Sequence, residues 1–74
     1  MTGFVIEYHR PTGRRRVYTF PGQDGPRQAL RRRFELEEVR ENSDWEIVSL
    51  NSDSLETLES THSRYFAGED LRSA

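Results

Sequence analysis

The sequence predicts one small α+β domain with the element order β-β-α-β-α. Three observations support this prediction: the chain has only 74 residues, three short segments alternate between apolar and polar positions, and two longer segments carry apolar residues at helical spacing. We expect a three-stranded, mainly antiparallel sheet with one helix packed on a face and a second, amphipathic helix at the C-terminal end. The domain should span residues 1–68, and residues 69–74 should form a disordered tail.

The first two strands are predicted to form a β-hairpin. Residues 3–10 and 14–20 alternate in polarity and are rich in aromatic and β-branched side chains. Between them, residues 11–13 read Pro-Thr-Gly, a sequence typical of a tight turn that ends in a left-handed glycine. A three-residue loop at this point places Ile6 opposite Tyr18, so that the aromatic-rich faces of the two strands coincide.

The first helix is expected over residues 26–40. Asp24 is a candidate cap for the free N–H groups of the first turn, and Pro26 suits the first helical position. Its apolar side chains form a wide, imperfect stripe, which consists of Ala29, Leu30, Phe34, Leu36 and Val39. Leu30 and Phe34 are four residues apart and share one face, whereas Ala29 and Leu36 share another strip with Val39 beside it.

A third strand and a second helix complete the predicted fold. Residues 45–50 carry apolar side chains on both faces of a strand, which suits a strand that is covered on one side and partly shielded on the other. Asp53 and Glu56 resemble a capping box at the start of the second helix. The apolar stripe of this helix consists of Leu55, Leu58, His62, Tyr65 and Phe66.

Composition excludes several classes of protein. The chain contains no cysteine, so disulfide bonds, thiol nucleophiles and thiolate metal sites are absent. No apolar run approaches the about 20 residues of a membrane span, and the N-terminus does not resemble a signal peptide. We therefore expect a cytoplasmic protein that does not insert into a membrane.

The net charge of −2 conceals a strong asymmetry along the chain. All eleven basic residues are arginines, and eight of them lie in residues 1–34 beside only two acidic residues. Residues 35–74 hold the other eleven acidic residues. This division allows two opposite interpretations, an arginine-rich surface for nucleic acid and an acidic surface for a basic partner.

The residues that usually carry chemistry do not form a recognisable site. His9 and His62 are the only histidines, and neither has the spacing of a metal ligand pair. Phosphate-binding loops and nucleophile motifs are absent. We therefore expect no enzymatic activity, no cofactor and no metal site.

The leading functional hypothesis is a non-catalytic interaction or regulatory domain that binds a protein partner, or a second copy of itself, through the second helix. Its predicted contact residues are Leu55, Leu58, His62, Tyr65, Phe66 and Trp45. One alternative is an RNA- or DNA-binding module that uses Arg14, Arg15, Arg16, Arg27, Arg31 and Arg32. Another alternative is an acidic inhibitor or charge mimic.

The segment Asp-Trp-Glu-Ile-Val-Ser-Leu at 44–50 resembles small bacterial or phage proteins, and this likeness implies no site.

Overall fold

The computed structural model describes residues 1–40 and 42–68 and confirms the predicted α+β fold. The elements are β1 (Thr2–His9), β2 (Arg14–Phe20), α1 (Gly25–Val39), β3 (Trp45–Ser52), α2 (Leu55–Thr61) and a short 3-10 helix, η1 (Ser63–Phe66). The tail predicted at 69–74 lies outside the described residues. Within the described part of the chain, no helix is both long and apolar enough to cross a membrane.

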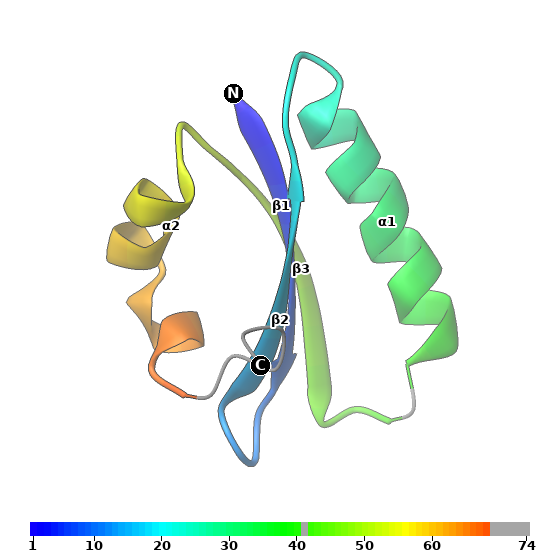
Figure 1. Ribbon diagram of the computed structural model, residues 1–74. Helices are drawn as coiled ribbons and strands as arrows, with labels where there is room; N and C mark the ends of the chain where they lie inside the picture. Colours follow the sequence, from blue (N-terminus) through cyan, green and yellow to red (C-terminus); the bar gives the residue numbers. More distant parts are fainter. Residues whose placement is uncertain (41, 69–74) are drawn as a thin grey trace.

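The molecule has three layers, because a helical layer covers each face of the sheet. The strand order is β2-β1-β3, and β1 pairs antiparallel with both of its neighbours. Figure 1 shows α1 on one side of the sheet and α2, followed by η1, on the other. The apolar residues on both faces of β3 are explained by this double cover.

The predicted register of the hairpin was wrong by one residue. Ile6 lies opposite Val17, not Tyr18, and His9 lies opposite Arg14. The loop therefore has four residues, 10–13, and it is closed by a hydrogen bond from the Gly13 N–H to the His9 carbonyl at 2.8 Å. Gly13 takes the left-handed conformation (φ 76°) that the sequence indicated.

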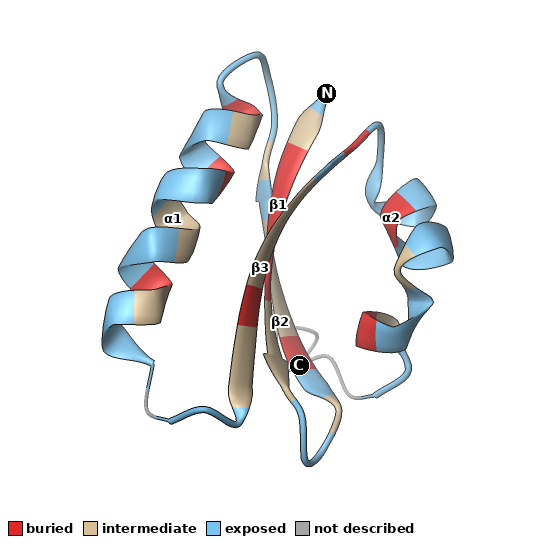
Figure 2. Ribbon diagram, turned by 180° about the vertical axis from the view of Figure 1, so that it is seen from behind, coloured by how far each residue is buried: buried red, intermediate tan, exposed pale blue. Residues whose placement is uncertain are grey.

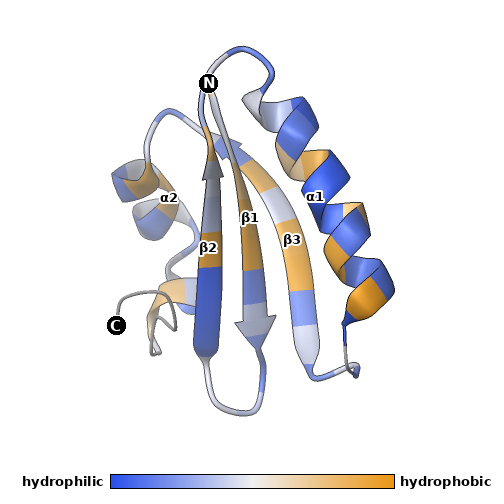
Figure 3. Ribbon diagram, turned by 45° about the vertical axis from the view of Figure 1, so that its right-hand side comes forward, coloured by the Kyte–Doolittle hydropathy of each residue, from blue (hydrophilic) through white to orange (hydrophobic). Residues whose placement is uncertain are grey.

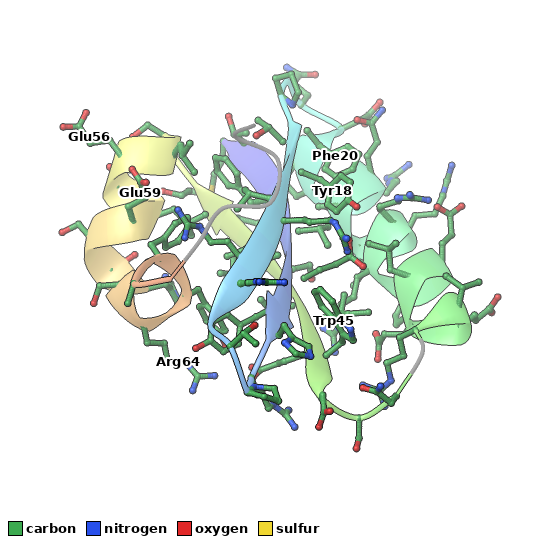
Figure 4. All side chains as sticks on the ribbon, turned by 60° about the horizontal axis from the view of Figure 1, so that its bottom comes forward. Tyr18, Phe20, Trp45, Glu56, Glu59 and Arg64 are labelled. Carbon is green, nitrogen blue, oxygen red and sulfur yellow. The ribbon has the colours of Figure 1, made fainter. Side chains whose placement is uncertain are left out.

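The physical reason for the shift is the position of Arg10. Its backbone N–H donates to the Asp44 carbonyl at 2.9 Å, and its side chain reaches Glu46, so Arg10 is held by the chain leading into β3 and does not pair with Arg14. A one-residue shift moves every side chain of a strand to the other face. Consequently Tyr18 and Phe20 lie on the α1 side of the sheet, together with Trp45 (Figure 4).

The sheet separates two apolar clusters. On the α2 side, the buried residues are Phe4, Ile6, Leu58 and Tyr65. On the α1 side, they are Val5, Ala29, Leu36 and Ile47. Figure 2 shows buried segments of α1 recurring along the side that faces the sheet. Because each cluster is small, neither helical layer can be lost without exposing about half of the core.

Only part of the predicted apolar stripe of α1 is buried. Ala29 and Leu36, two of its members, face the sheet. The other three members are exposed: Leu30 at 43%, Phe34 at 55% and Val39 at 74%. In Figure 3, hydrophobic positions on α1 are interspersed with hydrophilic ones. The helix does begin as predicted, with Pro in the first turn, but Asp24 makes no side-chain capping hydrogen bond.

Close approach of α1 to the sheet explains this choice of face. Gly3 of β1 lies against the Gly25 backbone and the Ala29 methyl group, and a Cβ at either glycine would overlap backbone atoms. Only very small side chains fit where the first turn of α1 crosses β1. The helix therefore turns its small residues inward at this end, and the larger pair at 30 and 34 is left outside.

The second helical segment is shorter than predicted and has a different cap. Ser54, not Asp53, is the N-cap residue, and its hydroxyl accepts a hydrogen bond from the Thr57 N–H at 3.1 Å. The α-helix ends at Thr61 and is followed by η1. Residues 60–63 read Ser-Thr-His-Ser, a run of weak helix formers. The break directs Tyr65 toward β1, where its ring meets that of Tyr8 edge to face at 5.2 Å.

A polar network fastens η1 to the sheet at Glu46. The Tyr65 hydroxyl donates to the Glu46 carboxylate at 2.6 Å, and Arg64 and Arg10 donate to it at 3.0 and 3.3 Å. The hydrogen bond from Tyr65 lowers the pKa of Glu46, burial opposes this, and the two guanidinium groups lower it further.

This network predicts an acid-dependent loss of stability. Because the pKa of Glu46 is lower in the folded state than its usual value of 4.5, the unfolded chain binds the proton more readily. The carboxylate therefore stabilises the fold above pH 4.5, and this contribution disappears as the pH falls through its folded pKa.

In urea unfolding between pH 7 and pH 3, we expect the Glu46→Gln variant to be less stable than the wild type at neutral pH and to lose less stability on acidification. Glu59→Gln, at an exposed position, is the control, and equal slopes for both variants and the wild type would contradict the prediction.

Candidate functional site

The predicted contact residues on the second helical segment do not form one accessible surface. Leu58 is completely buried and Tyr65 is 7% exposed, so both belong to the core of the folded domain. His62 and Phe66 are half-buried, and Leu55 is exposed at 42%. Of the six residues proposed from the sequence, Trp45 lies elsewhere, on the α1 side of the sheet (Figure 4).

The six candidate arginines are also spread over different surfaces. Arg15 is buried on the α2 side, where its guanidinium lies 4.8 Å from the centre of the Phe66 ring and Nη1 donates to the Gly68 carbonyl at 2.6 Å. Alternation along β2 puts Arg14 and Arg16 on the α1 side.

The remaining three arginines belong to α1. Arg32 lies over the Tyr18 ring at 5.6 Å and pairs with Glu35, whereas Arg27 and Arg31 are exposed. The arrangement therefore does not bring the six arginines into one continuous patch.

Two of the sequence-derived candidates, Arg16 and Trp45, do come together in a hollow of about 150 Å³. We call it the Trp45 hollow. It lies between the C-terminal end of α1 and the sheet, and it opens to solvent. Its lining consists of Glu7, Arg16, Leu36, Val39, Arg40 and Trp45.

The topology explains why these residues meet. Glu7 and Arg16 are directly opposite each other on β1 and β2. Trp45 is the first residue of β3 and pairs with His9 on the other side of β1. The last residue of α1 is Val39, and the strands extend beyond it at this end of the molecule. On the α1 side of the sheet, the strand ends near Trp45 are therefore not covered by the helix.

Polar and aromatic neighbours fix the Trp45 side of the hollow. The Arg16 guanidinium lies 5.2 Å from the centre of the indole, within the range of a cation–π contact. The His9 ring is 4.8 Å from the indole at a tilt of 49°. Arg40 Nη1 donates to the Trp45 carbonyl at 3.3 Å. The hollow is thus partly organised before any ligand enters.

The electrostatics of the hollow favour an anion. Among the described residues that line the hollow, Glu7 supplies the only carboxylate, and this accepts a 2.6 Å hydrogen bond from the Tyr18 hydroxyl. Burial raises the pKa of the Tyr18 phenol, and the hydrogen bond to Glu7 raises it further, so the phenol stays protonated as a donor at neutral pH. Among the described residues, Arg16 and Arg40 form no ion pair with an acidic side chain. Their remaining N–H groups are suited to a carboxylate or phosphate oxygen.

Size limits what the hollow does chemically. Pockets for small-molecule substrates usually measure about 300–1,000 Å³, and this hollow is large enough for one side chain or one phosphate group. The described residues that line it include a single carboxylate and no second acid to form a catalytic pair. In residues 1–40 and 42–68, no group of three or more His, Asp or Glu side chains is placed to hold a metal ion.

Comparison with known proteins gives no relative: no protein family model, no curated protein and no solved structure matches this chain.

Four residues of the hollow were not among the candidates from sequence: Glu7, Leu36, Val39 and Arg40. They come from different elements, and their proximity depends on the strand order and on where α1 ends. One local signal was present. Trp45 opens a strand a few residues after a helix, which places a large aromatic ring at the sheet edge closest to the end of that helix.

Proposed function

We propose that this protein is a non-catalytic protein-binding domain, and that the Trp45 hollow receives an acidic side chain from its partner. The observation that carries the proposal is that two arginines meet at Trp45 in a hollow with room for one side chain: the Arg16 guanidinium lies against the indole, and Arg40 donates to the Trp45 carbonyl. A protein partner would place a carboxylate against the arginines and an apolar residue on the aliphatic wall.

The chemistry of the wall supports a peptide segment as the ligand. Leu36 and Val39 give the hollow an aliphatic side, and Val39 is 74% exposed at its edge. A partially desolvated pocket strengthens a charge-assisted hydrogen bond, which contributes about 1.5–3 kcal/mol. Anchors of this kind, an aromatic ring with arginine, are typical of binding hot spots.

Nucleic acid is the second candidate, because Arg14 and Arg16 lie on the same face as Trp45 and could accompany a stacked base. One feature favours protein: the chain carries a net charge of −2, which opposes attraction of a polyanion.

Trp45 makes the proposal directly testable, because it is the only tryptophan in the chain and its fluorescence reports on the hollow. Short random peptides are first selected on the immobilised protein. We expect the selected peptides to contain Asp or Glu beside an aliphatic or aromatic residue, and to change the Trp45 emission on titration. Arg16→Ala and Arg40→Ala should each weaken binding about tenfold or more.

Arg27→Ala is the matched control, since Arg27 is an exposed arginine of α1 outside the hollow, and it should leave binding unchanged. Selected peptides without acidic residues, or binding that survives both hollow substitutions, would refute the proposal. Single-stranded RNA and DNA are titrated in parallel. Tighter binding of either one, falling steeply with salt and lost in Arg16→Ala, would assign the hollow to nucleic acid.

A further inference from the structure

Two exposed surfaces on opposite sides of the molecule have no role in the hollow. The first, which we call the α1 ridge, runs along the outer side of α1 and consists of Arg27, Leu30, Arg31 and Phe34. The second, which we call the α2 acidic surface, consists of Asp53, Leu55, Glu56 and Glu59.

The α1 ridge combines apolar area with unpaired positive charge. Its four residues follow the spacing i, i+3, i+4 and i+7, so they form one stripe on the helix. Phe34 is 55% and Leu30 is 43% exposed, which makes them two of the largest exposed apolar side chains of the domain. Among the described residues, neither Arg27 nor Arg31 forms an ion pair.

The α2 acidic surface has the opposite charge and its own apolar residue. Leu55 is 42% exposed, and Glu59 lies one helical turn after it. Figure 4 shows Glu56 and Glu59 on α2, beyond the sheet from α1. Within the part of the chain that the structure describes, the three acidic side chains of this surface have no basic partner.

We propose that the α1 ridge of one copy docks on the α2 acidic surface of a second copy. Arg27 and Arg31 would meet the three carboxylates, while Leu30 and Phe34 would cover Leu55. Both surfaces combine exposed apolar side chains with charged ones, and the two sets of charges have opposite signs. Charge complementarity of this kind sets partner choice and orientation. The proposal is independent of the Trp45 hollow, which neither surface includes.

The position of the two surfaces determines the form of the assembly. They lie on opposite faces of the sheet (Figure 1), so one copy cannot offer both to the same neighbour. The contact is heterologous, and a contact of this type continues from copy to copy and does not stop at a dimer. Few residues take part on each side, so the association should be weak and should weaken further as salt screens the charges.

The assembly is tested by sedimentation of the whole chain over a range of concentrations, at low salt and at about 0.5 M salt, where the Debye length is only a few ångströms. We expect the weight-average mass to rise past that of a dimer at low salt and to fall at high salt. Phe34→Glu replaces the largest apolar side chain of the ridge with a carboxylate that would face the acidic surface. Glu59→Arg replaces one of the three carboxylates of the acidic surface with a guanidinium that would face the ridge. Each variant alone should need about tenfold more protein, or more, to associate.

The decisive sample is an equimolar mixture of the two variants. Phe34→Glu keeps its acidic surface and Glu59→Arg keeps its ridge, so the mixture should form a 1:1 dimer and grow no further. Both substitutions are at exposed positions, and circular dichroism checks that each variant folds. Gln28→Glu introduces the same residue on α1 outside the ridge and should associate like the wild type.

Three results would overturn the proposal. A wild type that stays monomeric at low salt has no such contact. A mass that levels off at the dimer indicates a symmetric interface instead. A mixture that stays monomeric, while the wild type associates, shows that the two surfaces do not bind each other. Peptide binding in the Trp45 hollow would be unaffected by any of these results.

Discussion

Leu58→Ala is expected to lower the free energy of unfolding by about 2–5 kcal/mol. Leu58 is completely buried between α2 and the sheet, in the cluster with Phe4, Ile6 and Tyr65. Truncation removes buried methyl groups and leaves a cavity that the backbone cannot fully close. For a domain of this length the total stability is about 4–11 kcal/mol, so the loss would be a large fraction of it. Urea denaturation followed by circular dichroism measures the change.

The same helix provides the matched control. Leu55 lies three residues earlier and is 42% exposed, so Leu55→Ala should cost less than about 1 kcal/mol. If the two substitutions had equal effects, the assignment of Leu58 to the core would be wrong. This pair also separates the core from the proposed contact between copies, because Leu55 contributes to that contact and Leu58 does not.

Gly25→Ala is expected to destabilise the fold by about 2–3 kcal/mol, although alanine is the better helix former. A Cβ at Gly25 would overlap the Phe20 carbonyl oxygen and crowd the Gly3 backbone. Because these neighbours are backbone atoms of two paired strands, the first turn of α1 would have to move away from the sheet. Thermal and urea unfolding would both report the loss.

Gln28→Ala serves as the comparison, since it introduces the same residue on the exposed side of the same helix. It should leave stability unchanged or slightly raised. A stable Gly25→Ala variant would mean that the first turn of α1 does not approach β2 and β1 as closely as described.

Local patterns in the sequence predicted the elements and their order but not the faces they present. β2 carries apolar or aromatic residues on both of its faces, with Val17 on one face and Tyr18 and Phe20 on the other, so either register gives it a plausible buried face. The choice depends on Arg10, whose contacts with residues far along the chain, at 44 and 46, cannot be read from the turn alone. Tertiary contacts therefore decided the register.

The helices illustrate the same limit. Hydrophobicity placed Leu30 and Phe34 in one wide stripe with Ala29 and Leu36, without indicating which strip of it faces the sheet. The space beside β1 admits only Gly25 and Ala29 at the crossing, and this decides the buried strip. The candidate site was accessible to sequence reasoning only in part. Trp45 and Arg16 were singled out individually, for two different functions, and their proximity follows from the strand order.

The central position of β1 has a consequence for how the chain folds. β1 and β2 are neighbours in sequence and their hairpin closes a short loop, an event of microseconds. β3 pairs with the other edge of β1 across the intervening α1 segment, and this pairing joins distant parts of the chain, as between Phe4 and Leu50. Closing such a long loop costs entropy before the contacts compensate for it. We therefore expect the docking of β3 to limit the folding rate, so that substitutions along the β1–β3 seam would slow refolding more than substitutions in the hairpin loop.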